Sequence, residues 1–224
     1  DRTHNPEFTI LEFYVAYKDY FWMMEQTEQM LEKIAVNLHG TTQVQVGEKT
    51  ISFKAPFKRI GILDSIKEHT GYDLYGKSEE EIRKICKDLN LEADEYMGVG
   101  KMIDLIFGEK CEHSYIEPTF IIDYPVEMSP LTKKHRSKSG LVERFELMIN
   151  GKEIANSYSE LNDPIDQRER FEEQLPSSQF ARIHKSYMVS LSKIESIEKH
   201  RVKIGKELLP VSESYRERFY GRIG

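Results

Sequence analysis

Two glutamates, Glu146 and Glu153, flank an Asn-Gly dipeptide at 150–151 within a run of alternating apolar and polar residues. Asn-Gly between two such runs favours a β-hairpin with a two-residue type I′ turn. That turn would pair Glu153 with Met148, which brings Glu146 and Glu153 to one face as diagonal neighbours about 7–8 Å apart. In the same register, Glu146 lies opposite Ala155. Two carboxylates at this spacing could hold one Mg²⁺ ion, or they could form the solvated face of an amphipathic hairpin.

Two further segments carry side chains suited to binding a substrate. Residues 8–15, FTILEFYV, are rich in aromatic and β-branched types and predict a buried strand, on which Glu12 and Tyr14 share one face. A carboxylate beside a phenol could bind a substrate amine, or this could be an edge strand with one wet face. His4 lies in a proline-containing turn just before the strand. A later run, NSYSELNDP, alternates three more candidates along one face: Asn156, Tyr158 and Glu160.

Other kinds of site are not indicated by the sequence. His113 lies two residues after Cys111, but no second Cys or His pair has the spacing of zinc ligands. There is no Walker-type phosphate loop, dinucleotide-binding glycine fingerprint or nucleophile elbow. The two cysteines, Cys86 and Cys111, cannot form a disulfide framework, so we expect them to be packing residues in a reducing compartment.

The charge of the chain is unevenly spread. The 224 residues carry a net charge of −6, but residues 175–224 hold 10 Lys and Arg against 5 Asp and Glu, whereas the preceding 174 residues hold 22 against 33. This change of sign predicts two units with different partners, and a basic tail suits contacts with nucleic-acid phosphates. Two ordinary solvated surfaces would give the same totals. No apolar run approaches the roughly 20 residues that span a bilayer and no secretory signal opens the chain, so no membrane partner is expected.

These side chains need a scaffold, and the sequence predicts a mixed α+β fold. The patterns ahead of the Asn-Gly turn predict a helix over 19–38, a hairpin around 47–48 and a short helix capped by Asp64 and ending at Gly71. They then predict a helix that begins at a Ser78–Glu81 capping box and runs to about Leu91. A helix over 100–110 and a strand over 119–124 follow. A charged helix is expected within 162–174. From Leu175 onward short strands dominate, so we place a domain boundary at about Gln174.

Residues 1–174 resemble the catalytic domain of class II lysyl-tRNA synthetases, chiefly in the stretches RTHNPEFTILEFY, HGTT, PTFIIDYPVEMSPL and RFELMINGKEIANSYSELNDPIDQRERFEEQ. The resemblance implies an antiparallel sheet flanked by helices, in a cytoplasmic enzyme that is usually a homodimer. It implies that lysine is joined to ATP as lysyl-adenylate, with Mg²⁺ as cofactor, and that the lysyl group then passes to tRNA. That reaction needs no side-chain nucleophile, so no catalytic residue is assigned.

The resemblance also assigns roles by position. It implies that Glu146 and Glu153 hold Mg²⁺-ATP, that His4, Phe8 and Asn156 contact ATP with Phe8 near the adenine, and that the lysine pocket contains Glu12, Tyr14, Tyr158 and Glu160. One of these roles conflicts with strict strand alternation, which puts Asn156 on the face opposite Glu153. We therefore predict a β-bulge around residues 154–156.

The resemblance further implies that parts of the family's core lie outside these 224 residues. The motif 2 arginine strand would precede residue 1, and the motif 3 strand and helix have no counterpart after FEEQ. Both supply arginine contacts to ATP, and loss of one preorganised donor can cost about 2.7–4 kcal/mol in catalysis. We expect lysine-dependent adenylation by this chain to be very weak or undetectable.

Residues 175–224 resemble a different family, the C-terminal half of LytTR-type DNA-binding domains. The similarity lies in LPSSQFARIHKSYMVSLSKIESI and LLPVSESYRERF. It implies that His184 and Lys185 lie in a loop that contacts duplex DNA, although Glu213 stands where that family often has a basic residue. Three alternatives to a simple ligase remain: a DNA-binding regulator fragment, an artefactual join of two genes, and a tail with ordinary solvated charges. We expect the two parts to share few apolar contacts.

Overall fold

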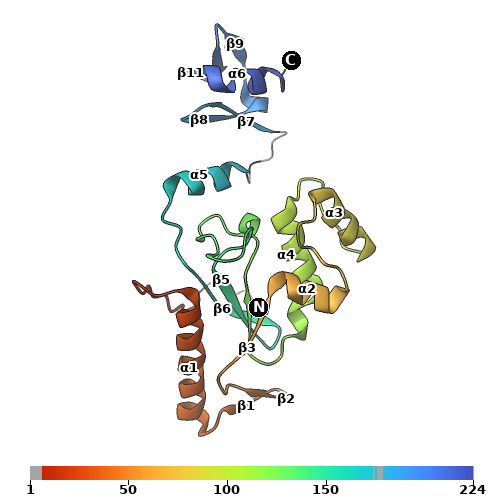
Figure 1. The fold of residues 1–224 in the computed structure, drawn as a ribbon, viewed down its shortest axis with the longest axis vertical. Helices are drawn as coiled ribbons and strands as arrows, with labels where there is room; N and C mark the ends of the chain where they lie inside the picture. Colours follow the sequence, from red (N-terminus) through yellow and green to blue (C-terminus); the bar gives the residue numbers. More distant parts are fainter. Residues whose placement is uncertain (1–6, 174, 176–178, 224) are drawn as a thin grey trace.

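The computed structural model describes residues 7–173, 175 and 179–223, and it confirms the predicted α+β class (Figure 1). We call residues 7–173 the body. Its elements in chain order are α1 (Tyr20–His39), β1 (Gln43–Val46), β2 (Lys49–Ser52), β3 (Lys58–Gly61), α2 (Ile62–Thr70), α3 (Glu79–Asp88), α4 (Val99–Lys110), η1 (Glu112–Ser114), β4 (Thr119–Ile122), η2 (Val126–Met128), β5 (Arg144–Ile149), β6 (Lys152–Tyr158) and α5 (Pro164–Glu173).

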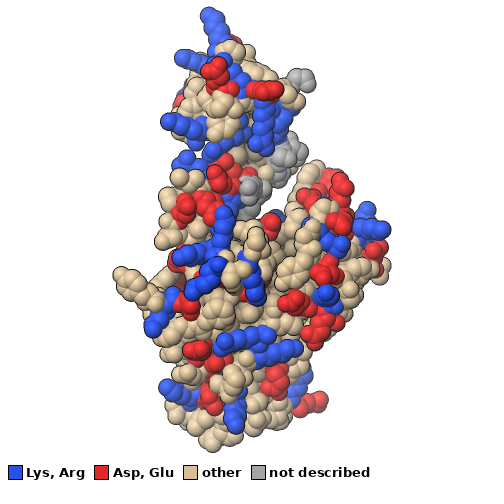
Figure 2. All heavy atoms as spheres, in the orientation of Figure 1, with Lys and Arg blue, Asp and Glu red and all other residues tan. Residues whose placement is uncertain are grey.

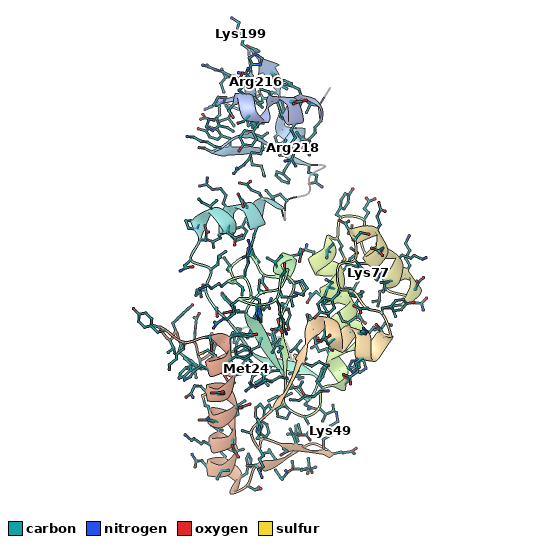
Figure 3. All side chains as sticks on the ribbon, in the orientation of Figure 1. Met24, Lys49, Lys77, Lys199, Arg216 and Arg218 are labelled. Atoms are coloured by element: carbon teal, nitrogen blue, oxygen red, sulfur yellow. The ribbon has the colours of Figure 1, made fainter. Side chains whose placement is uncertain are left out.

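The centre of the body is a four-stranded sheet in the order β3-β4-β5-β6. β3 runs parallel to β4, and the other two pairs are antiparallel. Alternation along β5 divides its side chains between two cores: Phe145 and Leu147 pack with α1 and the β1-β2 hairpin, whereas Met148 packs with α2, α3 and α4. Met24 of α1 is fully buried on the first of these faces (Figure 3). The sheet is therefore covered on both sides.

The ends of several helices follow the sequence signals. The Asp19 side chain caps α1 by accepting a hydrogen bond from the Trp22 amide, and α3 begins with the predicted capping box of Ser78 and Glu81. The predicted role of Asp64 is wrong. Gly61 is the N-cap residue of α2, and Asp64 lies in the first turn, where its negative charge still favours the helix dipole.

The strand predicted over residues 8–15 is not formed. This segment has no regular secondary structure, and Ile10, Leu11 and Tyr14 are each at least 70% exposed. A strand needs a neighbour to take up its backbone hydrogen bonds. Within the described residues, the sheet ends at β6, and no strand pairs with 8–15. The composition of the segment is that of a strand, but the described residues supply no strand to pair with it.

Residues 179–223, which we call the C-terminal unit, have a core of their own. The unit contains β7 (Phe180–His184), β8 (Tyr187–Ser190), η3 (Leu191–Lys193), β9 (Ser196–Glu198), β10 (Arg201–Ile204), β11 (Glu207–Pro210) and α6 (Glu213–Tyr220). All the side chains of its apolar cluster come from within the unit. Polar contacts link it to α5, through an ion pair between Arg182 and Glu172 and a hydrogen bond from Arg168 to the Lys185 carbonyl. Within the part of the chain described, no helix has the length and apolarity to cross a membrane.

Candidate active site

The β5-β6 hairpin has the predicted turn and the predicted bulge. Asn150 and Gly151 both have positive φ, of 54° and 68°, as a type I′ turn requires. Glu153 lies opposite Met148, but the register then shifts, so that Leu147 pairs with Ala155 and Glu146 with Asn156. The prediction that Glu146 faces Ala155 is therefore wrong by one residue. The bulge is what brings Asn156 to the same face as Glu146 and Glu153.

Glu146 lies in a largely buried, negatively charged environment. Its side chain is 16% exposed and forms an ion pair with Arg144. Burial raises the pKa of Glu146, Arg144 opposes that rise, and the negative charges of Glu153 and Asp104 add to it. Near these three acidic side chains, Arg144 is the cation that lowers the pKa of Glu146. The excess of negative charge suits a bound cation.

The donor set fits a cation shared with a ligand better than a closed protein cage. Among the described residues, no group of three or more His, Cys, Asp or Glu side chains could surround a metal ion. Mg²⁺ is commonly held by one or two carboxylates together with substrate phosphates. The Tyr124 hydroxyl is also buried beside Glu146, and burial together with the charge of that carboxylate raises its pKa. Glu146 and Glu153 are therefore the side chains that fit this role.

The residues predicted for the lysine pocket lie partly together. The Tyr14 hydroxyl donates to Glu12 Oε1 at 2.7 Å. This hydrogen bond is the main cause that raises the pKa of Tyr14, and the charges of Glu160 and Tyr158 contribute, so both lie within electrostatic range of the phenol. Phe8 is 81% exposed and packs into no site. His4 lies outside the described residues.

A cavity of about 170 Å³ adjoins the same face of the hairpin. It is lined by Arg144, Asn156 and Tyr158 on the strands and by the segment 128–132, which runs Met-Ser-Pro-Leu-Thr. A larger cavity of about 250 Å³ lies between the helices and the segment 125–141, and none of the predicted site residues line it. The smaller cavity is therefore the one that adjoins the predicted site residues.

A family model described as "tRNA synthetases class II (D, K and N)" matches residues 1–195. The chain belongs to this family. The match extends past the predicted domain boundary at about 174, through β7 and β8.

Relatives of this synthetase chain carry the name lysine–tRNA ligase. The protein from Porphyromonas gingivalis is 66% identical over 179 residues, which cover 80% of this chain and 31% of that protein. The one from Christiangramia forsetii is 63% identical over 80% of this chain and 32% of its own length. The one from Azobacteroides pseudotrichonymphae is 58% identical, with 80% and 36% covered. The chain thus spans about a third of the length of these relatives.

Sequence reasoning missed Arg144, which contacts Glu146 and Asn156 on the hairpin face. It occupies the position two residues before Glu146, so strand alternation already placed both side chains on one face. This spacing is the signal from which Arg144 could have been found. Residues 133–140, KKHRSKSG, form a basic loop in the same body. Two lysines of that loop form ion pairs within the body, Lys134 with Asp166 at 3.2 Å and Lys138 with Asp123.

The residues predicted to contact DNA lie at the turn between β7 and β8. His184 accepts a hydrogen bond from the Ser186 amide through Nδ1 at 3.1 Å, and Lys185 is exposed. In Figure 2, Lys and Arg side chains outnumber acidic ones over the C-terminal unit at the top of the molecule. This arrangement is compatible with an anionic partner.

Proposed function

We propose that the body is part of a lysine–tRNA ligase, which joins lysine to ATP and passes the lysyl group to tRNA. The bulged hairpin carries this proposal, because it aligns Glu146, Glu153 and Asn156 on one charged face beside a cavity. The names of the relatives, at 58–66% identity, support lysine as the amino acid. We propose a cytoplasmic homodimer, in keeping with two buried free cysteines that suit a reducing compartment.

The chemistry follows from charge. The carboxylate of lysine attacks the α-phosphorus of ATP, pyrophosphate leaves, and the mixed anhydride forms without a side-chain nucleophile. Mg²⁺, when bound, offsets the negative charge of the phosphates. Glu146 and Glu153 would hold that ion. The Asn156 amide would lie between the two ligands and contact ATP.

The lysine end of the site rests on two carboxylates and two phenols. Glu12 and Glu160 would attract the side-chain ammonium, since a charged donor forms strong hydrogen bonds with carboxylates. Tyr14 and Tyr158 would flank its alkyl stem. Phe8 and His4 remain proposed contacts of ATP.

Calorimetric titration of the purified chain with lysine and with Mg²⁺-ATP tests the assignment. Glu12→Gln should weaken lysine binding roughly tenfold or more, the effect of losing one charged hydrogen bond, and should change ATP binding little. Glu25→Gln, an exposed change on α1, is the matched control. Equal losses for both ligands would refute the pocket.

We also propose that the C-terminal unit contacts duplex DNA through His184 and Lys185, on the strength of its excess of 10 basic over 5 acidic residues within 175–224. Binding of this kind weakens steeply with salt, because it releases counterions from the phosphates. Titration of labelled duplex DNA with the full chain at several salt concentrations tests it. Affinity that is absent, or independent of salt and of Lys185→Ala, would remove this second function.

A further inference from the structure

Arg144 joins more parts of the site than any other residue on the hairpin face. Its Nη2 pairs with Glu146, its Nε donates to Asn156 Oδ1 at 3.2 Å, and its Nη1 donates to Ser129 Oγ at 3.0 Å. Its guanidinium carbon lies 4.5 Å from the centre of the Tyr124 ring. The side chain is 17% exposed, so these contacts are largely shielded from water. The rigid, planar fork of an arginine presents five donors, so it can bond to partners in several directions at once.

The contact with Asn156 fixes which way that amide points. A side-chain amide has one oxygen that accepts and one nitrogen that donates twice. Because Oδ1 accepts from Arg144, the two N–H donors of Asn156 are directed away from the guanidinium. Asn156 also lines the cavity of about 170 Å³. No acceptor for its nitrogen is found among residues 7–173, 175 and 179–223.

The bulge makes this arrangement possible. Arg144 lies opposite Tyr158, and Glu146 lies opposite Asn156, so the guanidinium reaches diagonally from one pair to the other. A regular hairpin would have put Ala155 opposite Glu146 and turned Asn156 to the other face. Arg144 therefore bonds to Asn156, a side chain that lies on this face only because of the bulge.

We propose that Arg144 is a positioning residue, which holds the Asn156 amide with both N–H donors turned to the cavity and so presents them to an anionic oxygen of the ligand. This role rests on the proposed ligase function and deepens it. Asn156 contacts the ligand, whereas Arg144 acts through Asn156. Lysine in place of arginine keeps the charge beside Glu146 but cannot hold Asn156 and Ser129 at the same time.

The first test uses the chain without ligand. In ¹H–¹⁵N spectra, Arg144→Lys should displace the side-chain amide pair of Asn156, and Asn156→Ala should speed the exchange of the Arg144 Nε proton. Arg59→Lys is the matched control, since Arg59 lies beside the buried Glu28 at 3.4 Å and touches no residue of the site. Unchanged Asn156 signals in Arg144→Lys would overturn the proposal, whatever the chain binds.

The second test measures Mg²⁺-ATP affinity in a double-mutant cycle, because Asn156 is assigned to ATP. Arg144→Lys and Asn156→Ala should each weaken binding roughly tenfold, and the double variant should weaken it no more than Asn156→Ala alone, because both changes remove one effect. Losses that multiply to roughly a hundredfold would show that Arg144 acts independently, and would overturn the proposal. If the unaltered chain binds no Mg²⁺-ATP, the ligase proposal fails for this chain, and the spectra alone decide the role of Arg144.

Discussion

The body and the C-terminal unit place their charges in different ways. In the body, Asp123, Glu143 and Arg170 are at most 5% exposed, and each is held by a partner of opposite charge. Among the described residues of the C-terminal unit, every buried side chain is apolar. The charged side chains there are exposed or half-buried. A buried charge costs several kcal/mol unless it is paired. Paired buried charges therefore indicate regions of the body where the geometry is fixed, as at the hairpin face. The C-terminal unit has many surface charges but, in the part that the structure describes, no such buried pair.

The largest expected effect tests whether the two cores are independent. Phe219 is 1% exposed in the core of the C-terminal unit. Phe219→Ala should cost that unit about 3–5 kcal/mol of stability, the usual loss for a buried phenylalanine. Amide spectra should then show the C-terminal unit unfolded and the body unchanged. Phe8→Ala, at an 81% exposed position, is the control and should alter neither core. Loss of the body signals together with those of the unit would contradict two separate cores.

A second change should act on the body alone. Arg170 on α5 is 5% exposed, pairs with Asp166 at 2.8 Å and donates to the carbonyls of Ser129 and Thr132. Arg170→Ala leaves these buried acceptors without their donor and should lower the free energy of unfolding of the body by about 3 kcal/mol. Urea unfolding followed by tryptophan fluorescence reports on the body, because Trp22 lies on α1. Arg168→Ala, an exposed change on the same helix, should change the free energy of unfolding little. An equal loss in Arg168→Ala would show that burial of Arg170 is not the cause.

Acid should act on the body in a milder, graded way. The hydrogen bond from Arg170 lowers the pKa of Asp166, and bonds from Arg136 and Ser159 lower the pKa of Glu143 although burial raises it. A lowered pKa in the folded state gives stability above the unfolded pKa of about 4, which is lost as the pH falls through the folded value. The urea midpoint of the body should therefore fall between pH 6 and pH 3. Asp166→Asn should lower the urea midpoint at pH 6 and make the midpoint depend less on pH. A pH dependence equal to that of the unaltered chain would contradict this.

Local patterns predicted the parts of the structure that depend on local chemistry. The type I′ turn follows from Asn-Gly, and the α3 start follows from Ser78 and Glu81, since each depends on neighbouring residues. The bulge needed one further step, the requirement that Asn156 share a face with Glu153. It is confirmed by the register of β5 and β6.

The errors concern partners that a single segment does not contain. Residues 8–15 have the composition of a strand, but a strand exists only where another accepts its hydrogen bonds. Arg144 has no motif of its own, because its role depends on Asn156 across the hairpin and on Ser129 in a separate segment. Resemblance and alternation predicted the candidate site residues, whereas the bonds of Arg144 to Asn156 and Ser129 depend on the folded structure.

Titration of ATP into the chain, with and without Mg²⁺, tests most directly whether the bulged hairpin is a nucleotide site. The account predicts binding that depends on Mg²⁺ and that Glu153→Gln weakens roughly tenfold or more, while the exposed Glu48→Gln in the β1-β2 turn leaves it unchanged. ATP binding that changes neither when Mg²⁺ is left out nor in Glu153→Gln would contradict the account.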